Sequence, residues 1–187
     1  MNTPAHAFIN LLILSRNPDH GKTAIIVTGA IIPDLVLILF YAWHKWLGTE
    51  ESQIWSIEYY RPLWQAGIDT LHSLPLIMLA MLVCWKARKP VLLLLFTSML
   101  LHSLGDFPLH HDDAHRHFFP FSEWRFVSPI SYWDPAHYGN WASLLEIFTV
   151  LAASIFLYRR QALLRVWIIT GLVVYGAYWI YVLLVWT

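Results

Sequence analysis

The chain has 187 residues, of which 58% are hydrophobic and 13% charged, and its mean hydropathy is +0.51. This composition is too apolar for an ordinary soluble domain and predicts one membrane-embedded domain over residues 1–187. Twelve Lys and Arg residues balance twelve Asp and Glu residues, so the chain lacks the basic face that nucleic-acid binding requires, and we expect no nucleic-acid partner.

The single cysteine makes a metal site with thiolate ligands an unfavourable expectation. Cys84 has no second cysteine to pair with, and it lies inside an apolar run that does not favour a thiolate metal site. Any bound metal is therefore expected on His and carboxylate side chains. The N-terminal "MNTPAHAFINLLILSR" has neither a basic region before its apolar part nor a cleavage site after it, so we expect it to belong to the mature fold.

The apolar segments predict helices, taken here in chain order. Residues 3–15 would rise only about 20 Å as a helix, which predicts a short, tilted or re-entrant helix. Five longer segments follow, each close to the ~17–25 residues of a spanning helix, at 22–44, 67–85, 90–107, 141–158 and 164–186. The predicted fold class is therefore all-α, a polytopic membrane bundle of about five to six helices, with residues 52–66 as an interfacial segment.

Charge is distributed unequally between the links. The short links "RNPDHGK", "KARKP" and "RRQALLR" carry eight of the twelve Lys and Arg residues, whereas the long links 45–66 and 108–140 are aromatic and rich in Pro, Asp, Glu and His. The positive-inside rule predicts that the short links face the cytoplasm and that the two long loops lie on the outer side.

Ionisable side chains within the apolar segments are predicted to share one depth. Counted at ~1.5 Å per helical residue from the nearest basic end, five of them lie about 15–21 Å deep: His6, Asp34, His72, His102 and Glu146. Asp106 lies one turn beyond His102 on the same helix face. Such groups are costly in hydrocarbon unless they face the bundle interior and pair there. The sequence thus predicts a polar layer past the midplane, toward the outer side.

A divalent metal is the expected partner of this layer. The mixed nitrogen and oxygen donors suit zinc, or less specifically iron or manganese, with one to three ions. The expected ligands are His6, Asp34, His72, His102, Asp106, His111 and His115, and the expected catalytic acids are Asp34, Asp106 and Glu146. Two alternatives stay open, a helix-capping role for His102 with Asp106 and a Glu146 side chain that extends toward the outer loop.

Four further residues are expected around the site. Asp69 precedes His72 by three residues and is predicted to accept the second ring N–H of His72. Ser73 and Ser103 adjoin the two histidines. Arg125 in "SEWRF" is expected either to meet a phosphate or to lie at headgroup level.

The histidines of the long loop are harder to assign. His110, His111, His115 and His117 fit a solvated loop, a second metal site or a pH-responsive lid, with at most two of them as ligands.

Five short motifs carry a resemblance to a known family. In order, "PAHAFIN", "GAIIPD", "TLHSL", "LLHSLGD" and "FFPFSEWRF" resemble the YdjM/YbcI-like membrane-bound metal-dependent hydrolases, over residues 5 to about 130. The resemblance implies a bacterial inner-membrane protein with its hydrolase site at His6, Asp34, His72, His102 and Asp106. Two positions depart from the family pattern. Val36 replaces a second acid, and "QAGIDTLHS" lacks the usual basic-glycine pair.

The order of the ligand-type residues is also remotely similar to that of zinc-dependent phospholipases C and P1-type nucleases. Those all-helical enzymes cleave phosphate esters with clustered zinc ions, and their site is completed by a late His-x-x-x-Glu helix. Here Glu146 is present, but Ala142 stands at the His position. A third ion would therefore need His137 or one of His110, His111 and His115.

These observations lead to one functional expectation and two alternatives. We expect a membrane-embedded metal-dependent hydrolase, phospholipase-like, that cleaves a phosphate ester of a lipid or lipid-linked substrate from the outer leaflet. The first alternative is a membrane di-iron oxidase or desaturase, for which His111 and His115 supply one His-x-x-x-His spacing. The second is a metal transporter or sensor, although no second half with matching broken helices is visible in the sequence.

Overall fold

The computed structural model describes residues 1–17 and 19–186, and no strand occurs among them. The predicted all-α class is confirmed. The helices are α1 (Thr3–Leu14), α2 (His20–Ile31), α3 (Leu35–Trp46), α4 (Glu51–Gln53), α5 (Pro62–His72), α6 (Leu74–Lys86), α7 (Pro90–Asp106), α8 (Gly139–Arg160) and α9 (Arg165–Trp186). Shorter turns are η1 (Ile32–Asp34), η2 (Ile54–Glu58), η3 (Pro135–His137) and η4 (Ala162–Leu164).

Three helical stretches are long and apolar enough to cross a membrane, namely His20–Trp46, Gly139–Arg160 and Ala162–Val185. A fourth is added if α5 and α6, which meet at 45°, count as one span. Helices α1 and α7 are apolar but have only 12 and 17 residues. At 1.5 Å per residue they rise about 18 and 26 Å, less than a ~30 Å hydrocarbon core. The predicted count of five to six spans is therefore not confirmed.

One apolar stretch is broken and a second contains a 3-10 turn, and a proline lies at or next to each of these places. The predicted span 67–85 is split where α5 ends at His72 and Ser73 adopts an extended backbone with ψ of 112°. Pro75 cannot donate a helical hydrogen bond, and the Ser73 hydroxyl accepts instead from Leu76 N at 3.3 Å to start α6. Between α2 and α3, Pro33 lies in the 3-10 turn η1. Asp34 at the end of this turn and His72 at the end of α5 belong to the candidate site.

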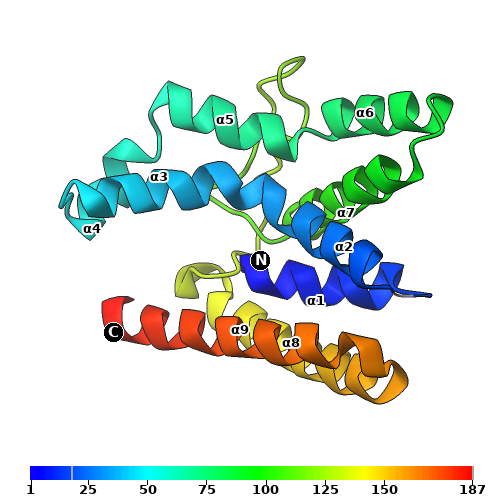
Figure 1. The fold of residues 1–187 in the computed structure, drawn as a ribbon. Coiled ribbons are helices and arrows are strands. Elements are labelled where there is room, and N and C mark those ends of the chain that lie inside the picture. The colour runs from blue at the N-terminus through cyan, green and yellow to red at the C-terminus, as the bar shows by residue number, and fades with distance from the viewer. Residues whose placement is uncertain (18, 187) are drawn as a thin grey trace.

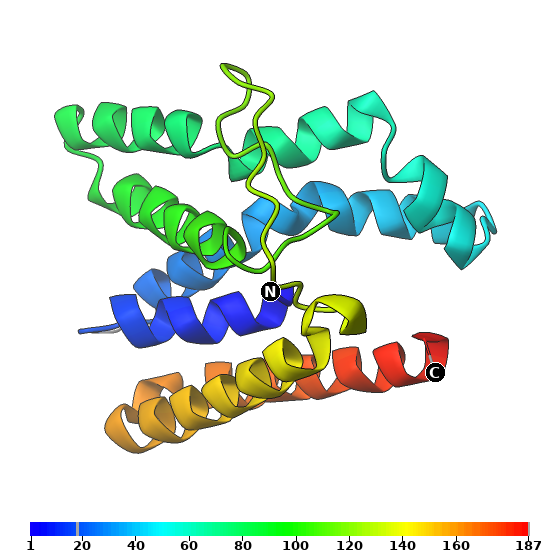
Figure 2. The same ribbon diagram turned by 180° about the vertical axis from the view of Figure 1, so that it is seen from behind.

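The three short basic links lie together at one end of the molecule. Figure 1 shows the links α1–α2, α6–α7 and α8–α9 at the same end, and Figure 2 shows the same grouping from behind. The opposite end carries α4 and the adjoining ends of α3 and α5. The links that carry most of the Lys and Arg residues are thus gathered at one end of the fold. The stretch 45–66, predicted as an outer loop, contains α4, η2 and the start of α5.

Helix α2 packs closely on α7, the helix that carries His102 and Asp106. A Cβ atom added at Gly29 would lie 2.5 Å from the Leu95 carbonyl oxygen, so only glycine permits this approach. Ser98 of α7 donates to the Ile26 carbonyl at 2.6 Å, and Asn10 of α1 donates to Ser98 Oγ at 2.8 Å. These buried polar contacts hold three helices in register.

The long segment after α7, residues 107–138, runs across the break between α5 and α6. Leu74 N donates to the His117 carbonyl at 2.9 Å, and Ser73 Oγ donates to the Phe119 carbonyl at 2.5 Å. Arg116 binds Asp69 of α5 through its backbone N at 2.8 Å and its Nε at 2.5 Å. The segment is therefore held against the helices by specific contacts.

Candidate metal centre

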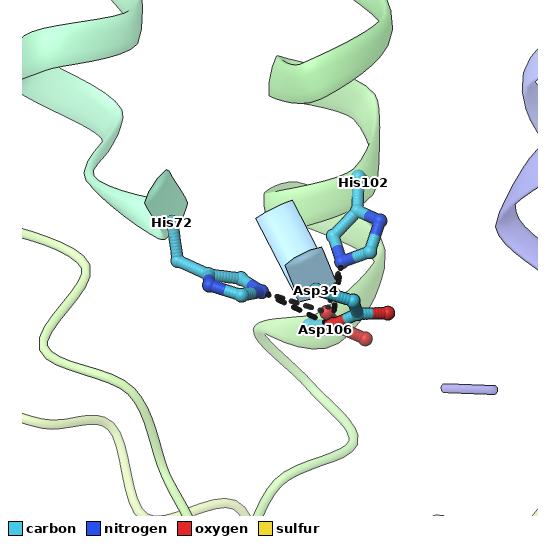
Figure 3. A group of neighbouring side chains, drawn as sticks. All are labelled: Asp34, His72, His102 and Asp106. Atoms are coloured by element: carbon cyan, nitrogen blue, oxygen red, sulfur yellow. Dashed lines mark ion pairs between the residues drawn. The ribbon is translucent and has the colours of Figure 1, made fainter. Parts of the chain in front are cut away.

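Four side chains from three parts of the chain point toward one another (Figure 3). Asp34 lies at the end of η1, His72 is the last residue of α5, and His102 and Asp106 occupy the last turns of α7. All four are buried, and each offers a ligand atom within 4.8 Å of the other three. The ends of η1 and of α5 thus place Asp34 and His72 at the end of α7.

The distances between the ligand atoms fit one metal ion. His102 Nε2 lies 2.9 Å from Asp106 Oδ2 and 3.5 Å from Asp34 Oδ1. His72 Nε2 lies 3.7 Å and 3.6 Å from the same two oxygens. A tetrahedral zinc site with bonds of about 2.1 Å separates its ligand atoms by about 3.4 Å. The group is a two-histidine, two-aspartate site with nearly that spacing.

Hydrogen bonds to backbone carbonyls set the tautomers of both histidines. His102 Nδ1 donates to the Ala30 carbonyl of α2 at 2.7 Å, and His72 Nδ1 donates to the Ile68 carbonyl at 2.9 Å. In the neutral ring each Nε2 atom is then an acceptor aimed at the centre, and neither has a hydrogen-bond partner among the described residues. An unpaired buried acceptor is costly, whereas metal-ligating histidines usually donate their other N–H in this way.

The predicted role of Asp69 is not seen. The Ile68 carbonyl, one residue earlier in the chain, accepts the His72 N–H. Asp69 is instead fully buried and bound by Arg116 of the long segment. The sequence argument failed because a backbone carbonyl one turn back is an acceptor at every helical position and leaves no side-chain signature.

Each carboxylate has one oxygen held by a neighbour and one facing the histidines. Asp34 Oδ2 accepts a hydrogen bond from Thr3 Oγ1 at 2.5 Å. Asp106 Oδ1 lies 2.9 Å from His6 Nε2 and 2.7 Å from the α-amino nitrogen of Met1. Asp34 Oδ1 and Asp106 Oδ2 remain as the inner pair. Thr3 is a supporting residue that the sequence reasoning missed.

His6 lies beside the centre. Its ring stacks on the ring of His102 at 3.6 Å between centroids, and its Nε2 is directed to Asp106. The structure therefore places this predicted ligand in contact with Asp106, outside the group of four ligand atoms.

Two loop histidines adjoin the centre as a second buried group, formed by Asp106, His110 and His115. His110 Nε2 lies 3.4 Å from Asp106 Oδ1, and the His115 ring stacks on His72 at 4.2 Å. Burial alone would lower the pKa of His110, but Asp113 and Asp106 raise it to about 9. Burial, with His72 and His110 nearby, holds the pKa of His115 well below its usual value, so His115 is neutral.

Two predicted site residues lie apart from both groups. His111 donates through Nδ1 to the Ser128 carbonyl at 2.6 Å and stacks on His137 at 3.6 Å. Glu146 of α8 accepts from Asn2 N at 2.9 Å and from Tyr175 OH at 2.8 Å. The structure therefore shows Glu146 as a buried anchor for the start of the chain, and its predicted catalytic role stays a prediction.

The hydrogen bonds that the structure describes for the remaining candidates do not reach the four ligand atoms. Ser73 caps α6, and Ser103 is fully buried on α7 with no hydrogen-bond partner for its Oγ in the described part of the chain. Arg125 is half-buried and donates to the Ala114 carbonyl at 2.7 Å and to Gln65 Oε1 at 3.2 Å. Its guanidinium stabilises the long segment in this structure.

Comparison with protein-family models, with curated proteins and with solved structures gave no match to this chain, so the resemblance to the YdjM/YbcI-like hydrolases stays a prediction.

Proposed function

We propose that this protein is a membrane-embedded metal-dependent hydrolase that cleaves a phosphate ester of a lipid or lipid-linked substrate. The observation that carries the proposal is the pair of buried Nε2 atoms of His72 and His102, aimed at two carboxylate oxygens and fixed by backbone hydrogen bonds. Zinc suits this donor set best, and iron or manganese fit it less specifically.

The chemistry follows from what such a site offers. A divalent ion supplies Lewis acidity, which polarises a phosphoryl oxygen and lowers the pKa of a water molecule toward ~7. In the hydrolysis a water oxygen bonds to phosphorus, the ester P–O bond breaks, and the released alcohol oxygen takes up a proton. The protein's part is to hold the site in place. Thr3 and His6 orient the two carboxylates, and Ala30 and Ile68 orient the two imidazoles.

The break between α5 and α6 favours a substrate that comes from the membrane. Non-helical backbone at membrane depth is tolerated where it is buried in protein or lines a polar cavity, and the extended Ser73 follows His72 of the centre directly. In our proposal α1 and α7 enter the bilayer as shorter helices beside the spans, which gives five to six membrane helices. The basic links face the cytoplasm of a bacterial inner membrane, and the centre opens toward the periplasmic side.

The test is hydrolysis of phospholipids by the purified full chain in detergent or lipid vesicles. We expect release of a phosphorylated headgroup or of phosphate from wild-type protein, abolished by a chelator and restored by Zn²⁺. Loss of even an outer hydrogen bond costs such sites about 10- to 100-fold, so His102→Ala should lose at least about 100-fold. His20→Ala, an exposed residue at the start of α2, is the matched control. Equal activity in both variants would refute the proposal.

A metal transporter or sensor is the second candidate, because of one specific observation. The break between α5 and α6 lies beside one candidate ion site, and broken helices at an ion site are typical of transporters. Vesicles that contain the protein would then take up Zn²⁺ in a manner that depends on His102. Zinc uptake without phosphate-ester hydrolysis would favour this candidate over the hydrolase.

A further inference from the structure

We propose that a second divalent cation binds between Asp106, His110 and His115, next to the His72–His102 centre, and that this second ion has the open coordination position. The inference rests on the proposed function and assigns its reactive ion. The observation behind it is that the two oxygen atoms of the Asp106 carboxylate contact different histidines.

The two oxygens of Asp106 face different sets of nitrogen atoms. Oδ2 lies 2.9 Å from His102 Nε2 and 3.7 Å from His72 Nε2, whereas Oδ1 lies 3.4 Å from His110 Nε2. The ligand atoms of Asp106, His110 and His115 lie within 4.8 Å of one another, and all three residues are buried. A carboxylate with both oxygens directed at such donors can bridge two ions, the arrangement of many two-metal hydrolytic sites.

A positive charge already lies at the outer oxygen. The α-ammonium of Met1 is 2.7 Å from Asp106 Oδ1 and 3.4 Å from His110 Nε2. His6 Nε2 also contacts this oxygen at 2.9 Å. An incoming metal ion would therefore have to displace the ammonium group and the His6 contact from Oδ1.

His110 is oriented for ligation by the neighbour of its other nitrogen. His110 Nδ1 lies 3.0 Å from Asp113 Oδ2, and its Nε2 lies 3.4 Å from Asp106 Oδ1. Such carboxylate–histidine pairs commonly support metal ligands. Two other histidines of the loop make different contacts. His111 contacts Ser128 and His137, and His117 Nδ1 lies 3.1 Å from the His115 carbonyl.

The number of donors distinguishes the two positions. The first centre has four protein donors, which is the closed set of a structural zinc site, whereas the second has three. Catalytic zinc sites combine three protein ligands with a fourth position for water or substrate. The loop site therefore offers the position at which a phosphate ester would bind, next to the ion that the first centre would hold.

The direct test is metal stoichiometry in the full chain, purified in detergent, stripped with a chelator and reloaded with Zn²⁺. We expect two ions per wild-type chain, one in His110→Gln and one in His115→Gln. His111→Gln is the matched control from the same loop and should keep two. A wild-type chain that saturates with one ion, or two ions in both the His110→Gln and His115→Gln chains, would overturn the inference.

A second measurement needs no substitution and so does not depend on the folding of a variant. Wild-type protein loaded with Mn²⁺ should give the electron paramagnetic resonance spectrum of a coupled pair, since Asp106 would bridge the ions. Spectra of uncoupled ions at saturation would overturn the inference. Two coupled ions without phospholipid hydrolysis would instead support the second site and refute the proposed hydrolase.

Discussion

His102 on α7 donates its Nδ1 proton to the Ala30 carbonyl of α2 at 2.7 Å, so one side chain joins the packing of two helices to the metal centre. Its other nitrogen lies 2.9 Å from Asp106 Oδ2, one turn further along the same helix. Any change that separates α2 from α7 should therefore move a ligand as well as weaken the fold.

Gly29→Ala tests this coupling. The added Cβ would lie 2.5 Å from the Leu95 carbonyl oxygen and 2.7 Å from Ser98 Cβ, both on α7. Overpacking of this kind costs about 1–3 kcal/mol, and the shift of Ala30 should also weaken zinc binding. Thermal unfolding in detergent and a zinc titration measure the two effects. Gly176→Ala on α9, where nothing lies within 4 Å, should be neutral or stabilising by up to about 1 kcal/mol.

Thr3→Val tests whether support of Asp34 matters for the metal. The substitution keeps the shape of the side chain but removes the hydroxyl that donates to Asp34 Oδ2 at 2.5 Å. Loss of such an outer hydrogen bond should reduce zinc affinity by about 10- to 100-fold, while the thermal midpoint changes little. Thr97→Val is the control, because Thr97 Oγ1 donates to the Leu93 carbonyl of its own helix. Equal zinc affinities for the two variants would contradict the role given to Thr3.

Arg116→Gln tests how the long segment is held over the site. The substitution removes the hydrogen bond from Arg116 Nε to the buried Asp69 carboxylate. Only the hydrogen bond from the backbone N–H of residue 116 to Asp69 then remains. A buried charge with an incomplete set of partners costs about 1–3 kcal/mol, so the thermal midpoint should fall, and His115 should lose its position beside His72. Glu123→Gln removes the other partner of Arg116. That side chain is 77% exposed, so its loss should cost less than about 1 kcal/mol.

The membrane orientation is tested by cysteine labelling in intact cells. Asp112 and Arg88 are both exposed, the first in the long segment and the second in a basic link. Asp112→Cys should react with an impermeant thiol reagent from outside, and Arg88→Cys only after permeabilisation. The native Cys84 is buried and serves as the background control. The reverse labelling pattern would place the metal centre on the cytoplasmic side.

The sequence could predict how deep the site residues lie in the membrane, but not which of them lie together. Helical rise converts a count of residues from the basic ends into a depth, and this brought Asp34, His72 and His102 into one layer. It gives no position within the layer. Glu146 was predicted at the same depth, but it lies against Asn2 and Tyr175 instead.

The break between α5 and α6 was the larger omission. Pro75 is visible in the sequence, yet the segment around it is apolar enough to be interpreted as a continuous span. The carbonyl partners of His72 and His102 were also invisible, since backbone acceptors do not depend on residue type. His110 follows Asp106 by four residues, as Asp106 follows His102. This spacing was the sequence signal that could have placed His110 next to Asp106.

The most direct test of the metal centre is the zinc content of purified wild-type, His102→Ala and His20→Ala chains, measured by elemental analysis after equilibration with Zn²⁺. The structure predicts that His102→Ala contains one zinc equivalent fewer than wild type, because it removes a ligand with a free Nε2, and that His20→Ala matches wild type. Equal zinc content in all three chains, or no zinc in the wild-type protein, would contradict the assignment of Asp34, His72, His102 and Asp106 as a metal site.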